Sequence, residues 1–105
     1  MPHWVKRNII WQQPAIAEAA ELKAGANRNR LVATLDAVER YAASGRSDNY
    51  DIAYFSTGPW RGHWRVKNPQ DPASIRLLFV DHAARRQLHI VRVRLRPTAY
   101  ADPPV

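Results

Sequence analysis

Basic residues recur at alternate positions in three short segments of the second half of the chain. In order, these residues are Arg65 and Lys67, then Arg76, then Arg92, Arg94 and Arg96. Most of the positions between them are apolar, and residues two apart share one face of a β-strand. The pattern therefore predicts a small sheet with one buried apolar face and one cationic face. An ordinary solvated strand face is the alternative interpretation for each arginine.

A cationic face of this kind suits chemistry on a phosphodiester. RNA can be cut without a metal when its own 2′-hydroxyl attacks the adjacent phosphorus. The enzyme must then position the attack, neutralise the phosphoryl oxygens and move two protons. Arg65, Arg76 and Arg94 are expected to supply the neutralising charge, because arginine is a poor proton donor. Lys67 is the lysine best placed to act as the base, since neighbouring cations favour its neutral amine.

Other side chains near these segments are expected to assist. Tyr100 follows the last basic segment and can stack on a base or orient the 2′-hydroxyl. His63 shares a face with Arg65 if the strand is regular, and it titrates near neutral pH, so it is a possible acid or base. His82 is expected at the surface, and His89 is assigned to the side of Val91 and Val93, which are expected to share one face, in a structural role. Candidates for ancillary RNA contacts are Arg61, Arg85, Arg86, Arg92 and Arg96.

Composition restricts the kind of protein and its partners. The chain has 105 residues, 46% hydrophobic, and a formal net charge of +7, which indicates one domain over residues 1–105 with one core. From residue 60 onward, nine Lys or Arg face three Asp, a net of +6. This asymmetry points to a polyanion as the partner: a nucleic acid, an anionic membrane or an acidic protein.

Without cysteine there is no disulfide, and the scattered histidines argue against a metal site, so no cofactor is expected. The sequence has no apolar run of roughly 20 residues and no signal peptide, so no membrane association is expected and a cytoplasmic location follows by default.

The elements that carry these residues follow from local patterns. Residues 4–11 predict a strand, 14–24 a helix ending at Gly25, and a second helix runs from the Asn27 cap to Ser44-Gly45. The short link between the helices predicts an antiparallel hairpin. Residues 52–55 fit either a strand or a packed linker. A turn over residues 81–86 is expected to separate the last two basic strands, and residues 101–105 are expected to fray. Trp60 is expected to pack in the core or at a sheet edge. We therefore expect an α+β fold: an N-terminal strand, then an antiparallel helical hairpin packed on a small, mainly antiparallel sheet.

This order of elements resembles the RelE/ParE superfamily of bacterial type II toxin–antitoxin toxins. The motif-level resemblance lies in Trp64-Arg65-Val66-Lys67, in Ile75-Arg76-Leu77-Leu78-Phe79, and in Arg94 with Tyr100. It implies a RelE-like, microbial ribonuclease-like fold and, since the basic positions are kept, the branch of ribosome-dependent mRNA endoribonucleases. On that resemblance Arg94 lies near the leaving 5′ oxygen. A ParE-like inhibitor of DNA gyrase and a non-catalytic nucleic-acid-binding module remain as alternatives.

The same resemblance implies partners. The protein is expected to act on mRNA in the ribosome and to form a tight complex with an acidic antitoxin from a neighbouring gene. Such a segment would fold on binding and cover the basic face, docking as a helix or an added strand.

Overall fold

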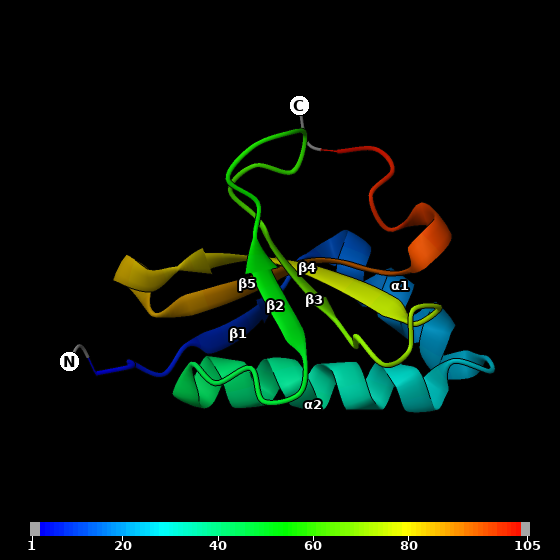
Figure 1. Cartoon of the computed structure of the whole chain (residues 1–105), viewed down its shortest axis with the longest axis horizontal. Helices are drawn as coiled ribbons and strands as arrows, with labels where there is room; N and C mark the ends of the chain where they lie inside the picture. The colour runs from blue at the N-terminus through cyan, green and yellow to red at the C-terminus, as the bar shows by residue number, and fades with distance from the viewer. Residues whose placement is uncertain (1–2, 104–105) are drawn as a thin grey trace.

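The computed structural model describes residues 3–103 and contains two α-helices and a five-stranded mixed sheet (Figure 1). Along the chain the elements are β1 (Asn8–Trp11), α1 (Gln13–Ala24), α2 (Arg28–Ser44), β2 (Asp51–Tyr54), β3 (Trp64–Lys67), β4 (Ile75–His82), the short 3-10 helix η1 (Ala83–Arg85), β5 (Gln87–Leu95) and a second one, η2 (Arg96–Thr98). The sheet order is β1-β5-β4-β3-β2. Only the β1–β5 pairing is parallel, and the other three are antiparallel. The predicted α+β class is thus confirmed.

Both helices cover the same face of the sheet. Ala15 of α1 and Val38 of α2 belong to one buried cluster with Leu77 of β4 and Val93 of β5. Figure 1 shows α2 running along the sheet and α1 crossing near the end of β5. The local signals for the helices are present: Pro14 lies in the first turn of α1, and α2 ends at Gly45 in the left-handed region with φ 74°. No helix in residues 3–103 has the length and apolarity that crossing a bilayer requires.

Several strands differ from the sequence-based prediction in their extent. The first strand contains only Asn8–Trp11. Of residues 52–55, for which a strand and a packed linker were both open, 52–54 belong to β2 and pair with β3. The β4–β5 hairpin is longer than expected, because pairing continues to His82 and Gln87.

A register shift in the hairpin moves one residue off the predicted apolar face. Phe79 pairs with Ile90 while Leu78 pairs with Arg92, so Val91 is the additional residue of a bulge. One extra residue interrupts the two-residue alternation. Ile90 therefore joins Val93 in the core, and Val91 does not, contrary to the expectation that it shares a face with Val93.

Gly45 lies directly beneath a tryptophan ring. Its φ is +74°, and a Cβ added there would lie 2.5 Å from Trp4 Cε3. We expect Gly45→Ala to lower the free energy of unfolding by more than the roughly 1–2 kcal/mol of left-handed strain alone, because the ring must also move. Urea unfolding measures this change.

Gly58 provides the matched control for that substitution. It also has positive φ, +85°, but a Cβ there would meet nothing within 4 Å. Gly58→Ala should therefore show the strain without the steric contact. An equal loss for the two variants would contradict the assigned role of the Trp4 ring.

Candidate nucleic-acid interface

The basic residues of β3, β4 and β5 do share one face of the sheet, the face opposite the helices. Arg76 of β4 pairs across the sheet with Arg94 of β5, and Leu78 of β4 is flanked by Arg65 of β3 and Arg92 of β5. Their neighbours in sequence, such as Leu77 and Val93, belong to the core on the helix side. The alternation therefore places Arg65, Arg76, Arg92 and Arg94 on one face as predicted, whereas Arg96 follows the end of β5 and lies in η2. We call this surface the open face.

Two of these arginines are buried and hold segments of the chain. Arg76 is only 5% exposed and donates to the carbonyls of Ser74 (3.3 Å) and Pro72 (3.2 Å), which ties down the loop before β4. Arg92 is 9% exposed, and its guanidinium lies 4.7 Å above the Trp60 ring. Burial lowers the pKa of Arg92, with Arg94 adding to the effect and Glu18 and Asp102 opposing it. Both arginines thus contribute to folding, and neither has the solvated guanidinium that the sequence pattern suggested.

Trp60 and the C-terminal tail, residues 96–103, cover part of the open face. Trp60 is 5% exposed and Ala99 is fully buried. The indole Nε1 of Trp60 donates to the carbonyl of Tyr100 at 3.1 Å. The sequence analysis missed this layer because Trp60 was expected to pack in the core or at a sheet edge, and residues 101–105 were expected to fray. Of these, 104 and 105 lie outside the described residues.

Beside this layer lies a cavity of about 300 Å³ with one arginine and several aromatic rings. Its lining residues are Phe55, Thr57, Pro59, Trp60, Arg65 and Tyr100, and we call it the Arg65 cavity. The Tyr100 ring meets the Phe55 ring edge-on, with 6.0 Å between centroids. The loop between β2 and β3 and the tail therefore bring together residues that the sequence did not connect.

Arg65 lines this cavity and has one hydrogen-bond donor without a partner. Its Nη2 donates to Asp51 at 2.9 Å, and its guanidinium carbon lies 6.0 Å from the Phe55 ring centroid. Its Nε–H is buried and has no hydrogen-bond partner among residues 3–103. A buried donor without a partner is unfavourable unless a ligand or water supplies an acceptor. The site thus combines a donor for an anion with aromatic walls for a flat ring.

Lys67 and His63, the predicted acid–base residues, lie near this arginine in β3 and in the preceding loop. The Lys67 ammonium is 3.7 Å from the Asp51 carboxylate, so its observed ionic neighbour is an anion. This neighbour is the reverse of the cationic surroundings expected for Lys67. His63 packs edge-on against Trp60, with 5.2 Å between ring centroids.

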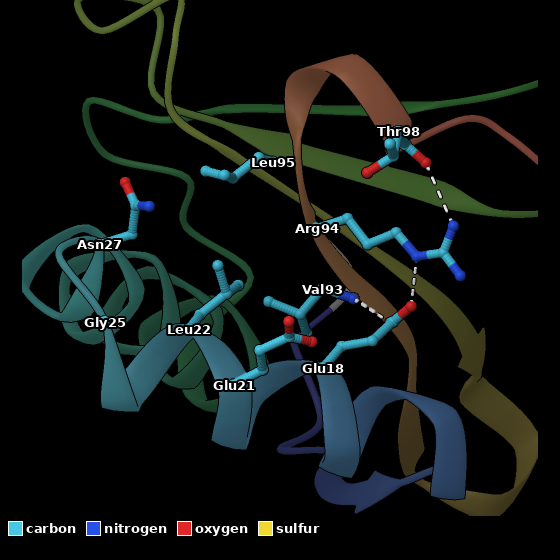
Figure 2. Close-up of a pocket in the computed structure, with 9 residues that line it drawn as sticks. All are labelled: Glu18, Glu21, Leu22, Gly25, Asn27, Val93, Arg94, Leu95 and Thr98. Atoms are coloured by element: carbon cyan, nitrogen blue, oxygen red, sulfur yellow. Dashed lines mark hydrogen bonds and ion pairs between the residues drawn. The ribbon is translucent and has the colours of Figure 1, made fainter.

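Arg94 is engaged at a different place, along the edge of β5. Its Nε is paired with Glu18 of α1, and its Nη1 donates to the carbonyl of Thr98 at 3.3 Å (Figure 2). The other oxygen of Glu18 accepts a hydrogen bond from the backbone N–H of Val93 at 3.0 Å, so the carboxylate also satisfies a backbone donor at the edge of β5. These side chains line a separate cavity of about 520 Å³ between α1 and η2. None of them lines the Arg65 cavity.

Four further candidate arginines are exposed and have no side-chain hydrogen bond within residues 3–103: Arg61, Arg85, Arg86 and Arg96. They are sterically free to contact a polyanion. We find no group of three or more His, Cys, Asp or Glu in the described part of the chain that could hold a metal ion.

His89 lies on the open face, because it pairs with Val80, and not on the side of Val93 as predicted. Its ring lies 4.3 Å from that of His82, between centroids. Its Nδ1 is 2.9 Å from Gln12 Nε2, and its Nε2 is 3.0 Å from Gln87 Oε1. Partial burial lowers the pKa of His89, and the neighbouring charges of His82 and Arg85 add to this. The contacts indicate a neutral ring with a structural role.

Comparisons of the chain with models of protein families, with curated proteins and with solved structures find no match.

Proposed function

We propose that the protein is a RelE-like toxin of a type II toxin–antitoxin system, a ribosome-dependent mRNA endoribonuclease that works in the cytoplasm at the Arg65 cavity. The observation that carries the proposal is the unpartnered, buried Nε–H of Arg65 beside the aromatic walls of that cavity. A nucleotide offers the matching chemistry: phosphate oxygens accept from a guanidinium, and an unstacked base lies against aromatic rings. The α+β architecture with both helices on one face is compatible with this class.

The reaction needs no group beyond the RNA and the side chains. The 2′-oxygen attacks phosphorus and loses its proton, the bond from phosphorus to the 5′-oxygen breaks, and that oxygen gains a proton. The products are a 2′,3′-cyclic phosphate and a free 5′-hydroxyl. In this scheme Arg65 stabilises the phosphoryl oxygens, Tyr100 orients the attacking ribose, and His63, beside Trp60, exchanges the protons.

A non-catalytic nucleic-acid-binding module is the second candidate, favoured by the engagement of the other arginines. Arg76 and Arg92 are buried, and Arg94 is paired with Glu18. If only phosphate contacts remain, binding weakens steeply with salt and tolerates many sequences. Inhibition of gyrase, as in ParE-like proteins, shares the scaffold and is separated from both by a supercoiling assay.

The proposal includes an acidic antitoxin, and an apolar groove between α1 and α2 offers it a docking place. The groove has a volume of about 380 Å³. Its lining residues are Trp11, Ile16, Ala19, Ala20, Lys23, Leu31 and Leu35. Ile16 is 45% exposed, a large fraction for an isoleucine. An amphipathic helix with acidic flanks fits such a groove and would meet Lys23 at its border.

Expression of the protein alone is expected to arrest translation, with cuts inside coding regions of mRNA. Co-expression with the product of the neighbouring gene should restore growth, and the two proteins should purify together at about 0.5 M salt, where charge contacts are strongly screened and apolar contacts persist. Mapping of mRNA ends and affinity purification measure these outcomes.

Intact mRNA during toxic expression would contradict the ribonuclease assignment. A protein that is harmless alone and purifies alone would contradict the toxin–antitoxin pair. Arg40→Ala, on the exposed side of α2, is the control that should remain as toxic as the wild type.

A further inference from the structure

The C-terminal tail is fixed on the open face by two side chains. Trp60 Nε1 donates to the carbonyl of Tyr100 at 3.1 Å. Arg92 donates to three further carbonyls, those of Ala99 (3.2 Å), Ala101 and Asp102 (3.3 Å). The carbonyls of four successive residues, 99–102, are therefore all bound by Arg92 or Trp60.

The arrangement makes the tail and the arginine mutually dependent. Arg92 is 9% exposed, and within residues 3–103 all its hydrogen bonds go to these tail carbonyls. A buried cation is strongly unfavourable unless it is hydrogen-bonded. Its guanidinium also lies 4.7 Å above the Trp60 ring, so the two side chains form one unit. If the tail leaves, Arg92 and the Trp60 N–H lose their partners together.

The path of the tail determines where Tyr100 lies. Between the bound carbonyls, the Tyr100 side chain turns toward Phe55 and forms part of the Arg65 cavity. Tyr100 is 38% exposed and its side chain has no hydrogen bond within the described residues, so its own contacts hold it only weakly. Its position depends on the backbone that Arg92 and Trp60 fix.

We propose that Arg92 and Trp60 are positioning residues, which hold the tail so that Tyr100 forms a wall of the Arg65 cavity and can stack on a bound RNA base. The part that concerns RNA rests on the proposed function. The part that concerns the position of Tyr100 stands without it, and the two are tested by different measurements.

The first measurement follows the tail in the protein without RNA. Arg92→Lys keeps the charge but loses the planar fork that reaches three carbonyls. In this variant we expect the nuclear Overhauser contact between the Phe55 and Tyr100 rings to disappear and the Trp60 indole proton to exchange faster with water. Trp60→Phe, which keeps the aromatic packing, should weaken the same contact. The matched control is Arg28→Lys at an exposed position of α2. Unchanged ring contacts in both tail variants would overturn the proposal.

The second measurement tests whether fixing of the tail by Arg92 affects binding of a short single-stranded RNA, hexauridylate. Loss of a stacking ring weakens binding by about 5- to 150-fold. We expect Arg92→Lys and Tyr100→Ala each to show a loss in this range, and the double variant to bind no more weakly than Tyr100→Ala alone.

The outcomes separate the two claims. Independent, multiplying losses in the double variant would overturn the positioning role, because Arg92 would then act by another route. If the wild type neither binds hexauridylate nor cuts mRNA on ribosomes, the proposed function fails, and the ring contacts still decide whether Arg92 positions Tyr100. Circular dichroism melting identifies a variant that does not fold, and Trp60→Phe then carries the test.

Discussion

Asp81→Ala is expected to lower the free energy of unfolding by about 3–5 kcal/mol, because it leaves a buried arginine without its anion. Arg7 Nε and Nη2 lie 2.9 and 3.3 Å from the two carboxylate oxygens of Asp81, a forked pairing. The two side chains are only 10% and 14% exposed. The Arg7 guanidinium also lies 4.0 Å from the Trp4 ring centroid, which keeps water from it. Native proteins are stable by about 5–15 kcal/mol, so this variant approaches the unfolding threshold.

Urea unfolding at neutral pH measures the effect, and a second ion pair provides the control. Arg40 and Asp48 are 3.2 Å apart, but their side chains are 52% and 34% exposed. Arg40→Ala should therefore change stability by at most about 1 kcal/mol. The variant Arg7→Met with Asp81→Ala removes both charges and should recover much of the loss. If it is as unstable as Asp81→Ala, the lost packing of the side chains, and not the unpaired charge, explains the result.

This ion pair illustrates what the sequence did not reveal. Arg7 was assigned to a first strand and Asp81 to a turn, and they are 74 positions apart. Nothing in the local pattern of either segment indicates the partner. The contact arises because β1 pairs with β5 beside β4, a long-range arrangement that only the folded chain specifies.

The helices, by contrast, were predictable from local signals. Pro14 and Gly45 lie at or beside helix ends for steric reasons that act within one turn. The strand at residues 51–54 was undecided because so short an apolar run gives a weak periodic signal, and its pairing with β3 resolves it.

For the candidate site, the two-residue alternation correctly predicted which arginines share a face but not which of them meet solvent. That depends on what covers the sheet. Arg92 is buried because Trp60 and the tail pack over it, and Arg76 is buried because its own loop folds back to accept its hydrogen bonds. Of the five predicted catalytic residues, Arg65 and Tyr100 line one cavity, while Arg94 lines another.

Arg65→Ala is expected to have the largest effect on activity, because Arg65 supplies the only charged side chain among the described residues that line its cavity. Removal of one preorganised donor to a developing negative charge typically slows a reaction by about 10²- to 10³-fold. The unpartnered Nε–H would be used in the transition state, when the phosphoryl oxygens gain charge. We therefore expect the cleavage rate on programmed ribosomes to fall by this factor.

The planar geometry of the Arg65 guanidinium allows a more specific test of the same role. Arg65→Lys keeps the positive charge but replaces the planar donors by a compact ammonium, so it should recover only a small part of the activity if Nε contacts the phosphate. Asp51→Ala removes the carboxylate that lies 2.9 Å from Nη2 and frees that donor as well, so activity should be retained or rise. Circular dichroism and urea unfolding must show that each variant is folded. A folded Arg65→Ala variant that cuts mRNA at the wild-type rate would show that the reaction does not take place in this cavity. The Arg94 side of the open face would then be the next place to test. Arg94→Ala removes the cation there, and Glu18→Gln removes the carboxylate that pairs with it.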